Sequence, residues 1–200
     1  MNNNASASKG KILVFSAPSG AGKTTLLNHL TDSVPNLVYS ISATTRPPRT
    51  GEIDGTHYFF MTKEDFERKA AAGEFAEWET VHGNSYGTPR AFIDSVVESG
   101  RHIVMDIDVF GKLKFDKAYP EAIGILIIPP SMTHLKSRLR SRGTDKDEVI
   151  NLRLQNAKTE MEAAKNQGKY EHTIVNDDLE TAKVEAVELV KRIVEEGRNT

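Results

Sequence analysis

Short apolar runs alternate with segments of helical periodicity along most of the chain. The runs at 12–16, 102–107, 124–128 and 173–175 are continuous and bounded by turn residues, which is typical of buried strands. The last helical segment, from about residue 179 to residue 196, repeats its apolar residues at intervals of three and four and is expected to bury one face. This alternation predicts an α/β fold in which a mainly parallel sheet is flanked by helices.

Residues 41–90 follow a different pattern, with shorter elements and more turn residues. Strands are expected at 58–61 and 75–81, and Thr62 is expected to cap a helix that ends at Gly73. We therefore predict a small mixed α/β insertion on the parallel core. The chain would then form a single domain over 1–200, with a flexible tail at 1–9, a core at 10–40 and 91–200, and the insertion at 41–90.

The most informative motif lies between the first predicted strand and the helix that follows it. There the chain has Ala17, Pro18, Ser19, Gly20, Ala21, Gly22, Lys23, Thr24 and Thr25, which is typical of a phosphate-binding loop. Glycines let backbone N–H groups turn towards phosphate oxygens, Lys23 can reach the transferring phosphate, and the Thr24 hydroxyl can ligate Mg²⁺. Ala17 stands where the usual pattern has glycine, so the loop is expected to form if that residue has a negative φ.

Two further groups suit phosphoryl transfer. Asp106 ends a buried strand at the level of the loop, where an acid usually orients Mg²⁺ through its water shell; a helix cap is the alternative. Arg46 and Arg49 stand three apart with two prolines between them, which stiffens the segment and fixes both guanidinium directions. Beside a phosphate-binding loop, this pair favours a second anion site for a phosphoryl acceptor over a solvated basic turn.

The composition narrows the function classes. Of the 200 residues, 38% are hydrophobic and 27% are charged, which suits a single globular enzyme. A formal net charge of −2 argues against a general nucleic-acid binder. The absence of cysteine excludes disulfides, thiolate catalysis and cysteine metal sites, and it fits a cytoplasmic location. Segment 1–8 lacks the apolar stretch of a signal peptide, and no apolar run is long enough to span a membrane.

Several motifs in a fixed order identify a family resemblance. They are the segments 42–52, 55–58, 74–78, 83–88 and 106–108, followed by Arg138, by 142–144, by Arg153 and by 175–178. In this order they resemble the signature of guanylate kinases, from about residue 11 to residue 194. The resemblance implies a P-loop kinase core with a mobile GMP-binding part at 41–90 and a helical lid at 137–154. It also implies transfer of the γ-phosphoryl group of ATP to GMP, with Mg²⁺.

The resemblance implies roles for individual residues. The GMP site would consist of Ser42, Arg46, Arg49, Glu52, Tyr58, Glu77, Tyr86, Thr88, Asp106 and Asp108. Arginines and tyrosines in this set would hold the phosphate, and Ser42, Glu77, Thr88 and Asp108 would read the guanine. Carboxylates suit the N1–H and N2–H₂ donors of guanine and hydroxyls suit its O6 acceptor, whereas adenine reverses this pattern. Catalysis would use Lys23, Arg46, Arg138, Arg142 and Arg153, and Asn176 would contact the adenine side.

The predicted function is therefore Mg²⁺-dependent phosphoryl transfer from ATP to GMP, with Thr24 and Asp106 on the metal and no nucleic-acid or membrane partner. Two alternatives stay open: a catalytically silent guanylate-kinase-like interaction module, and a related P-loop kinase with another phosphorylated acceptor. The intact loop and arginines argue against the first, and the base-reading set argues against the second. The sequence leaves open the oligomeric state, monomer or small homo-oligomer, and the effect of Phe110, where the family usually has glutamine.

Overall fold

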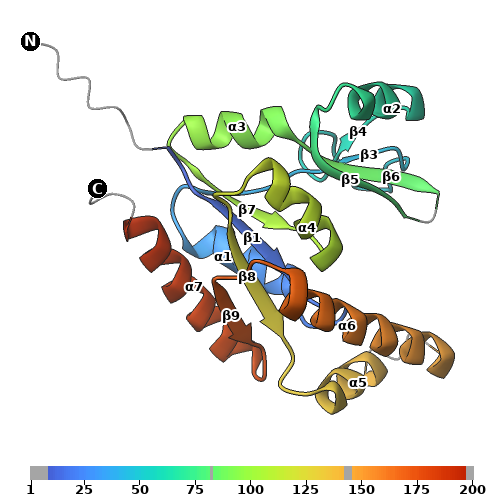
Figure 1. Cartoon of the computed structure of the whole chain (residues 1–200), viewed down its shortest axis with the longest axis vertical. Coiled ribbons are helices and arrows are strands. Elements are labelled where there is room, and N and C mark those ends of the chain that lie inside the picture. The colour runs from blue at the N-terminus through green and yellow to red at the C-terminus, as the bar shows by residue number, and fades with distance from the viewer. Residues whose placement is uncertain (1–8, 82, 142–145, 197–200) are drawn as a thin grey trace, which may run out of the picture.

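The computed structural model describes residues 9–81, 83–141 and 146–196. Its larger sheet, the core sheet, is parallel throughout and has the strand order β2-β7-β1-β8-β9. The strands are β1 (Ile12–Ser16), β2 (Leu37–Tyr39), β7 (His102–Asp106), β8 (Ile123–Ile128) and β9 (His172–Val175). The surrounding helices are α1 (Lys23–Ser33), α3 (Arg90–Glu98), α4 (Val109–Ala118), α5 (Met132–Ser141), α6 (Asp147–Gln167) and α7 (Leu179–Glu196) (Figure 1). The predicted α/β fold is confirmed.

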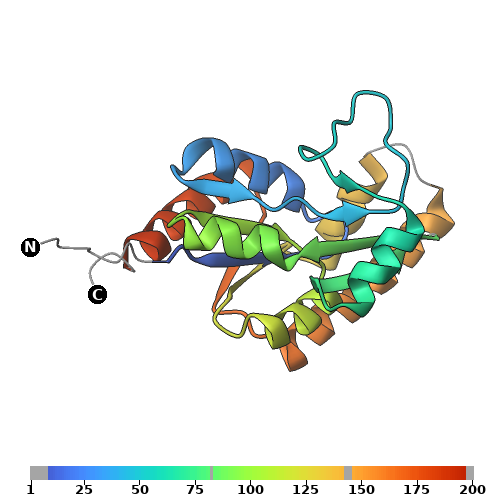
Figure 2. The ribbon, with the colours of Figure 1, turned by 90° about the horizontal axis from the view of Figure 1, so that it is seen from above.

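The core sheet is covered on both faces. Every residue of β1 is buried, and its successive side chains alternate between two layers of helices. Leu13 and Phe15 pack with α1 and α7, whereas Val14 packs with α3 and α4. Figure 2 shows α1 and α4 on opposite sides of the sheet. The apolar run at 12–16 is continuous because both of its faces meet helices.

A second, smaller sheet is built from residues between β2 and α3. Its strands are β3 (Ala43–Thr44), β4 (Phe59–Phe60), β5 (Phe75–Val81) and β6 (Asn84–Pro89), in the order β4-β3-β6-β5. Strands β3 and β4 are parallel and the other neighbours are antiparallel. Helix α2 (Lys63–Ala71) packs on this sheet through Phe66, which clusters with Ala43 and Phe75. This arrangement agrees with the predicted mixed insertion, while the boundaries at 41–90 and 137–154 stay predictions.

Several local expectations can be compared with the structure. Ala17 has the negative φ that the loop requires, since Asn36 is the non-glycine residue with a positive φ in the described ranges. The Thr62 hydroxyl accepts a hydrogen bond from the Asp65 N–H and caps α2, as predicted. The strand expected at 58–61 is shortened to the two residues of β4. Of the helices in the described ranges, none combines the length and the hydropathy needed to cross a bilayer.

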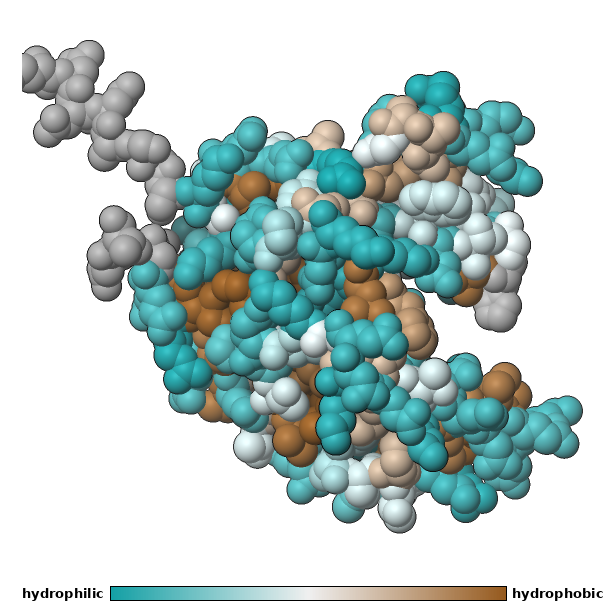
Figure 3. All heavy atoms as spheres, viewed as in Figure 1, coloured by the Kyte–Doolittle hydropathy of each residue, from teal (hydrophilic) through white to brown (hydrophobic). Residues whose placement is uncertain are grey.

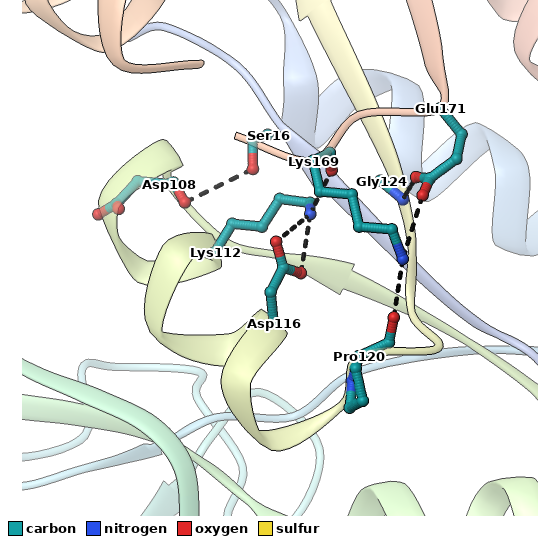
Figure 4. A network of polar contacts seen from close by, with 8 residues as sticks. All are labelled: Ser16, Asp108, Lys112, Asp116, Pro120, Gly124, Lys169 and Glu171. Atoms are coloured by element: carbon teal, nitrogen blue, oxygen red, sulfur yellow. Dashed lines mark hydrogen bonds and ion pairs between the residues drawn. The ribbon is translucent and has the colours of Figure 1, made fainter. Parts of the chain in front are cut away.

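A buried lysine fixes α4 to the core (Figure 4). Lys112 is fully buried, and its Nζ lies 2.8 and 2.7 Å from the two carboxylate oxygens of Asp116. The same Nζ donates a hydrogen bond to the Lys169 carbonyl at 2.6 Å and lies 4.8 Å from the ring centre of Tyr170. These contacts offset the cost of removing an ammonium from water. They join α4, which begins just after Asp108, to the segment that follows α6.

Candidate active site

The carboxyl ends of the core strands are the place where ligands of open parallel sheets bind. The surface is hollowed between the small sheet on one side and α5 with the outer part of α6 on the other (Figure 3). Two cavities of about 330 Å³ each lie at these strand ends, and Asp108 lines both of them. The shared residue makes the two cavities neighbours, which is the geometry that transfer of a group between two ligands requires.

The first cavity, termed the loop cavity, lies at the predicted phosphate-binding loop. Its lining consists of Ala17, Pro18, Ser19, Gly20, Ala21, Gly22, Lys23, Thr24, Thr25, Asp108 and Glu160. Gly20 and Gly22 have φ values of 91° and 90°, a left-handed conformation that disfavours side chains. Gly22 is the N-cap of α1, so the unpaired N–H groups of the first helical turn lie at this cavity. The loop is therefore built to receive an anion.

Lys23 and Asp106 form an ion pair at the edge of the loop cavity. The Lys23 Nζ lies 2.5 Å from Asp106 Oδ1 and donates a hydrogen bond to the Ile107 carbonyl at 3.1 Å. The Thr24 hydroxyl lies 3.5 Å from Asp106 Oδ2. A hydroxyl and a carboxylate side by side are hard oxygen donors that suit Mg²⁺, which keeps several waters of its own. In the described ranges, no three His, Cys, Asp or Glu side chains gather as a metal cage.

The second cavity, termed the carboxylate cavity, lies between the small sheet and the core sheet. The predicted residues Ser42, Tyr58, Glu77, Tyr86, Thr88, Asp106 and Asp108 line it, together with Tyr39, Ser40, His57, Glu79, Val81, Gly87, Met105 and Ile107. Glu77 Oε1 accepts a hydrogen bond from the Thr88 hydroxyl at 2.7 Å. Burial raises the pKa of Glu77; the Thr88 bond opposes this rise and nearby Asp108 adds to it. The structure thus brings most of the predicted acceptor set together.

Asp108 has a second role besides lining both cavities. It is the N-cap of α4, and its Oδ1 accepts a hydrogen bond from the Gly111 N–H at 2.7 Å. Capping uses one carboxylate oxygen and leaves the other for the cavity. Asp106, for which a helix cap was the alternative, is the last residue of β7 and caps no helix. The structure therefore assigns the cap to Asp108.

Arg46, Arg49 and Glu52 do not line the carboxylate cavity but form a cluster of their own. The Arg46 guanidinium donates to Glu52 Oε1 at 2.8 Å and lies 5.4 Å from the ring centre of Tyr58. The Arg49 backbone N–H donates to Glu52 Oε2 at 2.6 Å. These bonds lower the pKa of Glu52 to about 2. Tyr58 and Tyr86, which do line the cavity, meet edge to face and place the cluster at its border.

Of the predicted lid arginines, Arg138 and Arg153 are described by the structure, and neither lines the loop cavity. Arg138 on α5 donates a hydrogen bond to the Asp177 carbonyl at 2.7 Å. Neither Arg138 nor Arg153 lines either cavity, and Arg142 lies outside the described residues. A catalytic role for these arginines requires their guanidinium groups to reach the loop cavity, and it stays a prediction.

Asn176 supports the phosphate-binding loop through a hydrogen bond to its backbone. It is buried, and its Nδ2 donates a hydrogen bond to the Ala21 carbonyl at 2.7 Å. A Cβ added at Gly22 would lie 2.6 Å from this nitrogen, so the loop packs closely against the side chain. Asn176 is absent from the lining of the loop cavity. Its predicted contact with adenine stays untested, and the contact that the structure gives it is with the loop backbone.

Among the site residues that sequence reasoning missed are Glu160 and Tyr39. Glu160 on α6 lines the loop cavity, and burial raises the pKa of its carboxyl; Asp108 adds to the rise, while the Ser19 backbone N–H and Lys23 oppose it. Tyr39 ends β2 and donates a hydrogen bond to Asp106 Oδ2 at 3.0 Å. Neither residue belongs to a local motif. Only the pairing of β2 with β7 and the path of α6 bring them to the site.

Comparisons with known proteins agree with this geometry. The family model described as guanylate kinase matches residues 9–196. A guanylate kinase of Carboxydothermus hydrogenoformans is 47% identical over 174 residues, which cover 87% of this chain and 84% of that relative. A guanylate kinase of Thermotoga maritima is 42% identical over 190 residues, covering 95% of this chain and 88% of that relative.

A solved structure extends the comparison to three dimensions. The crystal structure of guanylate kinase from Anaplasma phagocytophilum superimposes with a TM-score of 0.71 at 34% sequence identity. The match covers 94% of this chain and 87% of that one. Sequence and fold agree over nearly the whole length, so the chain belongs to the guanylate kinase family and has its P-loop kinase fold.

Proposed function

We propose that this member of the guanylate kinase family transfers the γ-phosphoryl group of ATP to GMP, giving ADP and GDP. The observation that carries the proposal is the pair of cavities that share Asp108. One of them has the backbone and the lysine that bind a polyphosphate. The other has the carboxylates and hydroxyls that suit a guanine edge. Two ligands in these cavities would have their reacting ends close together.

The loop cavity takes the donor in this proposal. Backbone N–H groups of the loop and the N-terminus of α1 bind its phosphate oxygens, and Lys23 leaves Asp106 to stabilise charge on the transferring group. Thr24 and Asp106 hold Mg²⁺, Asp106 through water. When bound, the metal neutralises phosphate charge and orients the phosphates for transfer. Asn176 keeps the loop in shape through its bond to the Ala21 carbonyl.

The carboxylate cavity takes the acceptor. Glu77 and Asp108 accept hydrogen bonds from the N1–H and N2–H₂ donors of guanine, and hydroxyls of Ser42 and Thr88 face the base. The bond that already joins Thr88 to Glu77 supports this assignment, because it fixes the direction of the carboxylate. The Arg46 cluster, with Arg49, Glu52, Tyr58 and Tyr86, holds the GMP phosphate.

Closure completes the site in this proposal. The small sheet at about 41–90 and the lid at about 137–154 move towards the core, and Arg138, Arg142 and Arg153 then reach the transferring phosphate. Closing over the phosphates also excludes water, which would otherwise hydrolyse ATP. ATP and GMP are the proposed small-molecule partners, with neither nucleic acid nor membrane among them. A cytoplasmic location is proposed because a chain without cysteine needs no oxidising compartment.

A coupled assay of ADP release with a panel of monophosphates tests the function. ATP and Mg²⁺ are supplied with GMP, dGMP, IMP, AMP, CMP or UMP, and GMP is expected to give by far the highest kcat/KM. ADP release with none of them would indicate the silent interaction module. A clear preference for a different acceptor would indicate the related P-loop kinase.

A further inference from the structure

Tyr39 links the two cavities through one side chain. It lines the carboxylate cavity, and its hydroxyl donates to Asp106, which neighbours the loop cavity. Strand pairing explains the contact: Tyr39 lies opposite Val104 on β7, and Asp106 lies two residues further along the same strand. Residues two apart share a face of a strand, so Tyr39 and Asp106 point to the same side of the sheet.

The other partners of Asp106 are residues that nucleotide binding is expected to recruit. In the described part of the chain, its carboxylate contacts Lys23 through Oδ1, and Tyr39 and Thr24 through Oδ2. Lys23 moves to phosphate and Thr24 to the metal in the function proposed above. The Thr24 contact is also long, at 3.5 Å, against 3.0 Å for the Tyr39 hydroxyl. Tyr39 is therefore the partner that stays when the donor binds.

The environment of Tyr39 suits a permanent donor. The side chain is partly buried, and burial first, then the charge and hydrogen bond of Asp106, raise the pKa of Tyr39 far above the ordinary tyrosine value. An ionised carboxylate can only accept hydrogen bonds, so in this contact the Tyr39 hydroxyl is the donor. A carboxylate that accepts such a bond has one oxygen fixed and the other free to face water or metal.

We propose that Tyr39 is a positioning residue that holds Asp106 in the orientation needed for the Mg²⁺ of the donor nucleotide. The inference rests on the proposed function, since it assigns the metal to Asp106. It adds that Tyr39, which lines the carboxylate cavity, orients the Asp106 carboxylate that serves the nucleotide in the loop cavity. Disturbing that wall at Tyr39 should therefore weaken Mg²⁺-dependent binding in the other cavity.

Tyr39→Phe tests the proposal, because it removes the hydroxyl and keeps the ring. The first readout is the affinity for ADP with and without Mg²⁺, measured by calorimetry on the whole chain without turnover. The second is kcat and KM for ATP and GMP as Mg²⁺ is varied. Loss of a residue that orients a metal ligand typically lowers metal affinity or activity by about 10- to 100-fold. We expect the enhancement of ADP affinity by Mg²⁺ to fall by about that factor, with affinity for ADP alone unchanged.

Tyr119→Phe is the matched control. Tyr119 donates to Asp94 Oδ1 at 2.8 Å, burial also raises its pKa, and it lines neither cavity. The control thus loses a tyrosine–aspartate bond without touching the site. We expect it to keep the wild-type enhancement of ADP affinity by Mg²⁺, whatever its effect on thermal stability.

Three results would overturn the inference: an unchanged Mg²⁺ enhancement in Tyr39→Phe, an equal loss in the control, or a rise in the KM for GMP as the sole change. A rise in the KM for GMP alone would mean that Tyr39 shapes the carboxylate cavity and does not position Asp106. Failure of the proposed function looks different, because wild-type protein would then bind ADP without any Mg²⁺ enhancement or would not phosphorylate GMP.

Discussion

The core sheet and the small sheet differ in how many of their residues are buried. All five residues of β1 are buried, and helices cover both faces of its sheet. In β5 only Phe75 and Ala76 are buried, while Trp78 and Val81 are about half exposed. The small sheet therefore depends on a small apolar cluster around Phe66. Regions with few buried contacts open most readily, so we expect the small-sheet wall of the carboxylate cavity to move more readily than the core around the loop cavity.

The largest expected effect on activity comes from Lys23 at the loop cavity. Lys23→Met should lower kcat by about 10³-fold or more, because it removes the charge that stabilises the transferring phosphate. The fold should persist, since the lysine lies at the edge of a cavity. The measurement is kcat for GMP phosphorylation together with the melting temperature. Lys63→Met, on the exposed side of α2, is the control and should leave kcat unchanged. Turnover above a tenth of the wild-type value would exclude the role given to Lys23.

A pair of phenylalanine substitutions tests whether the core sheet and the small sheet can be destabilised separately. Phe66 on α2, which packs on the small sheet, and Phe115 on α4, in the core, are both fully buried, and each stacks on an aromatic ring, Phe75 and Tyr119 respectively. Replacing either by alanine removes interactions worth about 3–5 kcal/mol. We expect Phe115→Ala to lower the melting temperature of the whole chain by about 10 °C. Phe66→Ala should instead loosen the small sheet and raise the KM for GMP about tenfold or more, with ADP affinity retained.

Equal melting temperatures and equal kinetics for the two variants would show that the sheets unfold as one unit. Calorimetric titration with ADP separates the outcomes, because it reports on the loop cavity alone. Loss of ADP affinity in Phe66→Ala would contradict the independence of the two regions.

Base selection should depend in part on Glu77, the carboxylate that the small sheet contributes to the proposed guanine site. Glu77→Gln replaces an acceptor oxygen by an NH₂ donor that would face a donor of guanine. Loss of such a charged hydrogen bond costs about 1.5–3 kcal/mol, or about 10- to 150-fold in kcat/KM for GMP. IMP lacks the 2-amino group, so it should be a weak substrate of the wild type and should suffer less. Glu64→Gln on the exposed side of α2 is the control. Equal losses for GMP, IMP and AMP would mean that Glu77 supports the fold and does not read the base.

The smallest expected effect is the pH dependence of stability that Glu160 causes at the loop cavity. The pKa of Glu160 is raised above its ordinary value of 4.5, so the folded chain binds this proton more tightly than the unfolded chain. Stability therefore falls as pH rises from that ordinary value to the raised one, and the loss is complete above both. Glu160→Gln should be more stable than wild type at pH 7, by less than about 1 kcal/mol because solvent screens the half-buried group. The gain should vanish below pH 4.5.

Melting temperatures at pH 4 and pH 7 measure this difference. Glu162→Gln, exposed on the same helix, makes the same charge change outside the loop cavity and should show no such pH dependence. A gain of equal size in both variants would assign the effect to the net charge of α6 and not to Glu160.

The core strands could be predicted from the sequence because each is a continuous apolar run between turns. The loop residues could also be predicted, since Gly20, Gly22 and Lys23 are adjacent in the chain and their spacing is itself the motif. Tyr39 and Glu160 could not, because they stand about 67 and 137 residues from Asp106 and Lys23 and only folding brings them near. Lys112 is similar, since nothing local distinguishes a lysine that will be buried from one on a solvated helix face.

The central place of β1 in the core sheet governs the order in which the chain can fold during synthesis. Its two neighbours are β7 and β8, which end at Asp106 and Ile128. A ribosome releases the phosphate loop long before either neighbour exists, so the loop has no sheet to hold it until well over half of the 200 residues have been made. The hydrogen bond from the buried Lys112 ammonium to the Lys169 carbonyl can form only later still. The nascent chain must therefore carry β1, a strand that is fully buried in the folded protein, exposed for much of its synthesis, which is when chaperones would be needed most.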